Sequence, residues 1–200
     1  MSNAHWLLLG LWIIYCFIHS WLAGITVKNF IQKFTGEAFK YYRPLYSVFA
    51  LLTLGLILWY QFSMQSPWLF PNKSYLFIPG IITALAGLCI MIICIYKYFY
   101  ELSGLQAMQK LQAKNTLQQS GLHQFVRHPL YLGTLLFIWG VFLIFPLLTN
   151  IIACVVITVY TLFGIKLEEK KLRIEFGESY IAYARKVPKL IPDFNGKNLK

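Results

Sequence analysis

The chain has 200 residues, of which 58% are hydrophobic and 12% charged, and its formal net charge is +11 at pH 7. A mean hydropathy of +0.58 with so few charges excludes an ordinary soluble domain. The excess of cations could suggest a nucleic-acid partner. Most of these cations flank apolar runs, however, so we expect contacts with the lipid bilayer and no nucleic acid.

Five apolar runs approach the roughly 20 residues that a helix needs to cross a bilayer. They predict an all-α, polytopic membrane protein with five transmembrane helices in a single domain over residues 1–200. The last two runs are short, since 16 residues at about 1.5 Å each cover only about 24 Å. The turn at 146–150 joins them, so they are expected to form a helical hairpin. The five predicted spans are 4–24, 44–62, 76–98, 130–145 and 151–167.

The distribution of Lys and Arg between the connections predicts the orientation, because cytoplasmic loops retain positive charge. Residues 25–43 hold four of these cations, 97–129 hold four, and 166–200 hold nine. On the other side, residues 63–75 hold only Lys73 and the turn at 146–150 holds none. We therefore expect the N-terminus outside and the C-terminus in the cytoplasm.

Two polar segments have helical periodicity. Residues 104–119 place their apolar side chains at spacings that can share one face, which predicts a short helix on the inner membrane surface. The C-terminal segment is predicted to form a cytosolic amphipathic helix that covers the hairpin and ends at Pro188. Its apolar stripe consists of Leu172, Phe176, Tyr180, Tyr183 and Val187.

Two polar clusters bracket the predicted hairpin. Arg127 and His128 come directly before its first helix, and Glu168 and Glu169 come directly after its second. The midpoint between positions 128 and 168 is 148, inside the turn. Because the two helices have the same rise per residue, both clusters are predicted to lie side by side at one depth.

The first cluster offers groups that bind an anion. Pro129 suits the first turn of a helix, so the backbone N–H groups of residues 130–132 are expected to face a ligand close to Arg127 and His128. A carboxylate or a phosphate would fit there.

Neighbouring residues extend this site. Gly133 permits close approach of a flat group to the backbone, the ring of Tyr131 can face a cation, and Glu168 and Glu169 can accept hydrogen bonds from an ammonium or vicinal hydroxyls. S-adenosylmethionine carries a carboxylate, an ammonium, a ribose and a sulfonium and would satisfy all of these groups. Nucleotides share about half of these features.

The motifs RHPLYLG, EE and FGESYIAYARKVPKLIP resemble the isoprenylcysteine carboxyl methyltransferase and phospholipid methyltransferase superfamily. Upstream, HSWLAGITVKNF and RPLYS resemble its small members, those similar to methanethiol S-methyltransferase and to the NnrU-like proteins. The resemblance implies a membrane enzyme that binds S-adenosylmethionine within residues 121–192, on the cytoplasmic side, and methylates a lipophilic acceptor. Carried over by position, it implies a cofactor-binding set of Arg127, His128, Tyr131, Gly133, Glu168 and Glu169.

One departure from the superfamily bears on the acceptor. The carboxyl methyltransferases have an arginine shortly before the Glu pair, whereas this chain has Gly164, Ile165 and Lys166 there. Lysine lacks the bidentate guanidinium fork. This difference favours a small or lipophilic thiol as acceptor. Carboxyl methylation of a prenylcysteine, N-methylation of a lipid, and a non-catalytic NnrU-like role remain alternatives. The residue that contacts the nucleophile is unknown, with Lys166, Arg173 and Arg185 as candidates.

Several polar residues have less specific interpretations. Tyr180 is a modest candidate for the site and His123 is equally compatible with packing and with function. His19 and Ser20 are expected to make contacts between helices. The four cysteines lack metal-ligand spacing, so we expect no metal site and small apolar packing residues instead.

Overall fold

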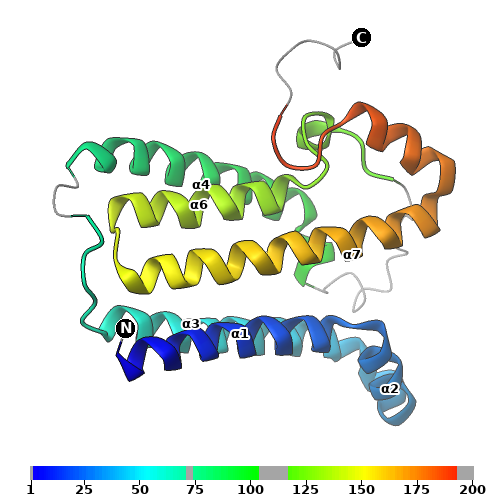
Figure 1. Ribbon diagram of the computed structural model, residues 1–200. Helices are drawn as coiled ribbons and strands as arrows, with labels where there is room; N and C mark the ends of the chain where they lie inside the picture. Colours follow the sequence, from blue (N-terminus) through cyan, green and yellow to red (C-terminus); the bar gives the residue numbers. More distant parts are fainter. Residues whose placement is uncertain (1, 71–73, 104–116, 193–200) are drawn as a thin grey trace. The chain divides into compact units, whose positions relative to one another are not determined.

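The protein is described by a computed structural model, in which residues 2–70, 74–103 and 117–192 have a defined placement, with side chains described outside 98–103. The described part is helical: α1 (Asn3–Ala23), α2 (Ile25–Thr35), the 3-10 turn η1 (Gly36–Tyr41), α3 (Tyr42–Ser63), α4 (Ser74–Ser103), η2 (Gly121–Gln124), α6 (Pro129–Ile144) and α7 (Leu148–Lys186). Figure 1 shows these elements in chain order from blue to red.

The membrane-spanning character is confirmed at the level of several apolar helices. Among the described residues, four helical stretches are long and apolar enough to cross a membrane: 3–23, 25–63, 74–97 and 148–186. Helix α6 is apolar but shorter. All five predicted spans coincide with helices, and four to five of the described helices are apolar enough to span a membrane. The expected surface helix at 104–119 lies mostly outside the described residues.

Two expectations need correction. The connection predicted over 25–43 contains helix α2, whose apolar residues recur at helical spacing. The last span was expected to end at 167, but α7 continues to Lys186. Its only break is at Gly177, where φ is 52°, a conformation that favours glycine. The segment after Gly177 is therefore a kinked continuation of α7.

The described residues form two compact units, the first from 2–70, 98–103 and 145–157 and the second from 74–97, 117–144 and 158–192. In the first unit, α1 and α3 pack through Leu8, Trp12 and Ile57. Two buried hydrogen bonds in series add to this contact. Trp12 Nε1 donates to Gln61 Oε1 at 2.9 Å, and Gln61 Nε2 donates to Asn150 Oδ1 at 2.8 Å. Because each of these polar side chains has a partner, the two hydrogen bonds fix the register of α1 against α3.

In the second unit, α4, α6 and the α7 segment from Thr158 lie side by side (Figure 1). Glycines allow α4 and α6 to approach closely. A Cβ added at Gly140 would lie 2.7 Å from the Cα of Ala84, and one at Gly80 would lie 2.9 Å from the Ile144 nitrogen. Trp139 Nε1 donates to Thr158 Oγ1 at 3.1 Å and joins α6 to α7. These contacts position the residues at the start of α6 against the middle of α7.

Candidate functional site

Arg127 is the centre of the polar cluster in the second unit. Its Nε and Nη2 atoms donate to Glu169 Oε1 at 3.0 and 2.5 Å. Its Nη1 atom donates to the carbonyl oxygens of Ala184 and Val187 at 2.7 and 2.6 Å. The guanidinium thus joins α7 before its kink to the end of α7 after it. Because almost all its donors are used within the protein, Arg127 is a positioning group more than a ligand contact.

Backbone bonds hold the same two segments together. The Arg127 N–H donates to Pro188 O at 2.8 Å, and the His128 N–H donates to Lys189 O at 3.1 Å. Val126 and Val187 are buried beside these bonds. The entry to α6 and the segment that follows α7 therefore form one rigid strap around the carboxylate of Glu169.

His128 lies in this strap and is only 4% exposed. Its Nδ1 atom is 3.7 Å from Glu168 Oε2 and its Nε2 atom is 3.5 Å from Glu169 Oε1. Burial lowers the pKa of His128; both carboxylates act to raise it, and the Arg127 charge lowers it further. The imidazole is therefore neutral near pH 7. Within the described part of the chain, its buried Nε2 has no hydrogen-bond partner.

The two adjacent glutamates have different environments. Glu169 is buried and its second oxygen, Oε2, lies 3.2 Å from Lys189 Nζ, so it is balanced by two cations. Glu168 has 44% of its side chain exposed and faces His128. Glu169 is thus part of the framework, and Glu168 is the carboxylate that a ligand can reach.

Tyr180 joins the site from beyond the kink at Gly177. Its side chain is 1% exposed, and its hydroxyl has no hydrogen-bond partner among the described residues. It packs with the buried Tyr183 and Val187, and Leu172 and Phe176 are partly buried against them. The neighbouring Tyr183 differs, since its hydroxyl donates to the His123 carbonyl at 2.7 Å. A buried unpaired hydroxyl is costly, so Tyr180 is a group that a ligand could satisfy.

The start of α6 differs in detail from the expectation. The Leu132 N–H donates to His128 O at 3.0 Å and is not free for a ligand. Gly133 faces α4, where an added Cβ would lie 2.9 Å from the carbonyl oxygen of Gly87. This close helix contact accounts for glycine at that position without a ligand. Tyr131 faces α7, where its hydroxyl lies 3.9 Å from a Cβ added at Gly164.

The three candidates for contact with the nucleophile do not converge. Lys166 is exposed on α7, with its ammonium 5.5 Å from the ring centre of Phe163. Arg173 and Arg185 are exposed as well. The geometry therefore provides no cationic clamp for a carboxylate acceptor from these side chains.

His123 is compatible from the sequence with packing and with function alike. It lies in η2, and burial lowers its pKa to about 4, with the Lys97 charge and the neighbouring His128 acting in the same direction. Two neutral histidines thus accompany the two glutamates. No group of three or more His, Cys, Asp or Glu side chains that could hold a metal ion occurs among the described residues.

Comparisons with known proteins show the family of the chain. The model of the phospholipid methyltransferase family matches residues 79–179, half of the chain, and this range includes Arg127, His128 and both glutamates. Methanethiol S-methyltransferase of Crocosphaera subtropica is 30% identical over 94% of this chain and 74% of its own length. Methanethiol S-methyltransferase 1 of Bradyrhizobium diazoefficiens is 29% identical over 87% of this chain and 62% of its own length.

A third relative, methanethiol S-methyltransferase of Pseudomonas deceptionensis, is 35% identical over 46% of this chain and 37% of its own length. No solved structure matches the chain. The family match spans the hairpin, the Glu pair and the start of the kinked segment, and the Crocosphaera relative extends the likeness over the upstream helices. The resemblance expected from the motifs is confirmed: this chain belongs to the phospholipid methyltransferase family of membrane methyltransferases.

Proposed function

We propose that this protein transfers a methyl group from S-adenosylmethionine to a small or lipophilic thiol. The observation that carries the proposal is the buried cluster of Arg127, His128 and Glu169, with Glu168 accessible beside it. The relatives named as methanethiol S-methyltransferases support a thiol acceptor.

The residues present fit S-adenosylmethionine. The buried Nε2 of His128, 3.5 Å from Glu169 Oε1, and the buried hydroxyl of Tyr180 make no hydrogen bond among the described residues, and such atoms favour a polar ligand. Glu168 can accept hydrogen bonds from an ammonium or from ribose hydroxyls. S-adenosylmethionine supplies an electrophilic methyl group on its sulfonium. Tyr131 and the start of α6 complete the proposed set, whereas Arg127 and Glu169 hold the other members in place.

The chain contributes alignment and exclusion of water more than acid–base chemistry. Methyl transfer needs a correctly oriented, desolvated nucleophile. Arg127 fixes the strap by four hydrogen bonds, which removes motion around His128 and Glu169. A carboxylate acceptor would need a paired cation, since an unpaired buried charge is costly. Lys166, Arg173 and Arg185 are all exposed, so a thiol suits this arrangement better.

The orientation follows from the positive-inside rule. Seventeen of the eighteen Lys and Arg side chains fall in 25–43, 97–129 and 166–200, and Lys73 alone falls on the other side. We infer an N-terminus outside and a cytoplasmic C-terminus in a five-span arrangement. The segment after Gly177 then serves as a cytosolic amphipathic helix over the methyl-donor site.

The test is a direct comparison of acceptors. Purified protein is incubated with isotope-labelled methyl donor and either an alkanethiol or a farnesylcysteine at matched concentration, and the products are identified by mass spectrometry. Faster methyl thioether formation supports the proposal, and Lys171→Ala, an exposed change outside the site, serves as control. Faster ester formation, or no binding of S-adenosylmethionine by calorimetry, would reject it.

A further inference from the structure

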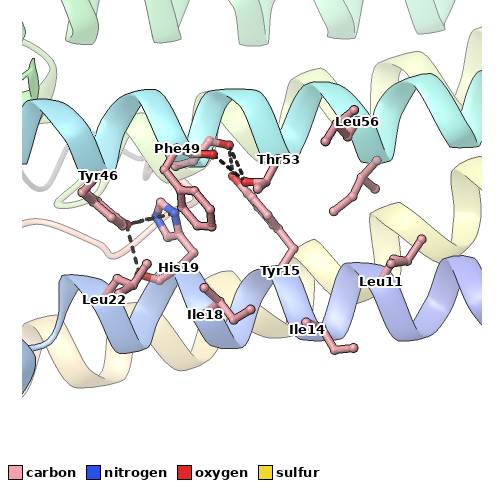
Figure 2. A pocket seen from close by; sticks show the side chains of 12 residues that line it. Leu11, Ile14, Tyr15, Ile18, His19, Leu22, Tyr46, Phe49, Thr53 and Leu56 are labelled. Carbon is pink, nitrogen blue, oxygen red and sulfur yellow. Dashed lines mark hydrogen bonds between the residues drawn. The ribbon is translucent and has the colours of Figure 1, made fainter.

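An elongated apolar groove lies between α1 and α3 in the first unit (Figure 2). Its volume is about 240 Å³, larger than the roughly 150 Å³ apolar cavity that holds a benzene ring. Its walls include Leu11, Ile18 and Leu22 from α1 and Phe49, Thr53 and Ile57 from α3. No charged side chain of the described residues lines it. An occupant must therefore be uncharged along its buried length.

The polar side chains in the groove are bonded to the protein. The Tyr46 hydroxyl is 2.9 Å from His19 Nδ1 and 3.0 Å from the His19 carbonyl oxygen, as Figure 2 shows. Tyr15 donates to Ala50 O at 3.4 Å, and Thr53 donates to its own helix. The contacts that the walls offer are therefore mainly dispersion contacts with an apolar chain.

The length of the groove indicates the kind of chain. Its α1 wall runs from Leu11 to Leu22, which corresponds to a rise of about 16 Å. The hydrocarbon core of a bilayer is about 30 Å thick, so the groove has the length of one leaflet. An acyl chain of a phospholipid matches both this length and the absence of charge.

The end of the groove at Leu22 lies next to the cation-rich segment 25–43. The carbonyl oxygen of the lining residue Leu22 accepts a hydrogen bond from Tyr42 at 2.7 Å, and exposed Arg43 follows directly in the first turn of α3. The segment 25–43 has four cations and one acid, Glu37, and therefore a net charge of +3. The four cations are Lys28, Lys33, Lys40 and Arg43.

Helix α2 places this end at the level of the lipid headgroups. It contains no buried residue, and its side chains Ile25, Phe30 and Phe34 are 70%, 62% and 76% exposed. The rings of Phe30 and Phe34 form one apolar patch, with centroids 4.9 Å apart. Exposed aromatic residues beside lysines are typical of a helix in the membrane interface. α2 turns away from α1 after Gly24, as expected for such a helix (Figure 1).

We propose that the groove between α1 and α3 binds one acyl chain of an anionic phospholipid, whose headgroup phosphate lies beside Arg43. The chain fills the apolar walls from Leu22 towards Leu11, and the net positive segment 25–43 selects an anionic headgroup over a zwitterionic one. This site is separate in its residues from the methyl-donor cluster and does not depend on the acceptor.

The test uses nanodiscs with equal amounts of phosphatidylglycerol and phosphatidylcholine that carry the same chains. Native mass spectrometry of the released protein is expected to show one retained lipid, enriched in phosphatidylglycerol. Arg43→Gln should lower this enrichment about fivefold, because a cation near the headgroups contributes about that factor. Lys171→Gln removes an equal charge on exposed α7 and should leave it unchanged.

Ala50→Trp fills the groove and should abolish the retained lipid, whereas Leu52→Trp, at a 65% exposed position outside the groove, should not. Thr53→Phe provides a second filling variant if Ala50→Trp aggregates. Equal retention of both lipids by the wild type, an unchanged lipid in a folded filling variant, or an apolar molecule other than a lipid in the groove would overturn the proposal.

Discussion

Arg127 and Glu169, which are 42 positions apart in the chain, approach to 2.5 Å between Nη2 and Oε1, and both side chains are almost fully buried. The same guanidinium also holds the carbonyl oxygens of Ala184 and Val187. One side chain thus joins the start of α6, the middle of α7 and the end of α7. Removal of Glu169 would leave the buried guanidinium without its carboxylate, and removal of Arg127 would leave the buried Glu169 with Lys189 as its one remaining cation in the described part of the chain.

Arg127→Ala should therefore destabilise the protein by about 3 kcal/mol, the lower part of the range for breaking a buried ion pair. Hydrogen exchange should accelerate most over residues 184–189, because the carbonyl oxygens of Ala184 and Val187 lose their bonds to the Arg127 guanidinium. Thermal unfolding in detergent and exchange mass spectrometry measure both effects. Arg173→Ala, at an exposed position, should change stability by less than about 0.5 kcal/mol. Equal effects of the two changes would show that Arg127 does not hold the start of α6 against α7.

Tyr180 and Tyr183 provide a matched pair for testing methyl-donor binding. Tyr180→Phe removes a buried hydroxyl without a described partner, so the free protein should keep or gain stability. It should nevertheless bind S-adenosylmethionine about tenfold more weakly if that hydroxyl contacts the ligand, since one hydrogen bond contributes about 1.4 kcal/mol. Calorimetry and thermal unfolding give the two readings.

Tyr183→Phe should show the opposite pattern. It removes the bond to the His123 carbonyl and should cost about 1 kcal/mol of stability, with unchanged affinity for the methyl donor. If both variants affect only stability, Tyr180 has a packing role alone.

The sequence predicted the apolar helices and the meeting of the two polar clusters because both depend on regular features. Long apolar runs indicate spans, and equal helical rise on both sides of the turn brings Arg127 opposite Glu169. The hydrogen bonds from Arg127 to the end of α7 were not predictable in this way. Their acceptors are backbone carbonyls of residues 184 and 187, and every residue carries such a group.

Gly133 illustrates a second limit. A glycine inside an apolar helix permits close approach of either a ligand or another helix, and the sequence does not distinguish them. Here Gly87 of α4 occupies that space. Helix α2 was predictable, because Phe30, Ile31 and Phe34 share one helical face. The lysines of 25–43 instead favoured a positively charged connection.

The two histidines of the site predict how stability depends on pH. Burial lowers the pKa of His123 to about 4, with Lys97 and His128 acting in the same direction, and burial also lowers the pKa of His128 despite Glu168 and Glu169. Below about pH 6.5 the unfolded chain binds protons that the folded protein does not yet bind. Stability should therefore fall as the pH decreases from 6.5 towards 4.

Thermal unfolding in detergent between pH 8 and pH 4 measures this dependence. The midpoint should be nearly constant above pH 7 and decrease below 6.5, and His123→Asn should make the decrease shallower. An unchanged slope in that variant would show that His123 does not contribute, and that the decrease arises at His128 or at the carboxylates.

The close contact between α4 and α6 predicts which glycines tolerate a methyl group. A Cβ at Gly140 would meet the backbone of Ala84, 2.7 Å from its Cα, and neither helix can yield locally because the obstacle is main chain. Gly140→Ala should therefore separate the helices and destabilise the protein by about 1 to 3 kcal/mol. Gly55→Ala is the control, because no atom lies within 4 Å of its Cβ and alanine favours the helix by up to about 1 kcal/mol. Thermal unfolding should thus give shifts of opposite sign, and a neutral Gly140→Ala would mean that α4 and α6 are not in contact at Ala84.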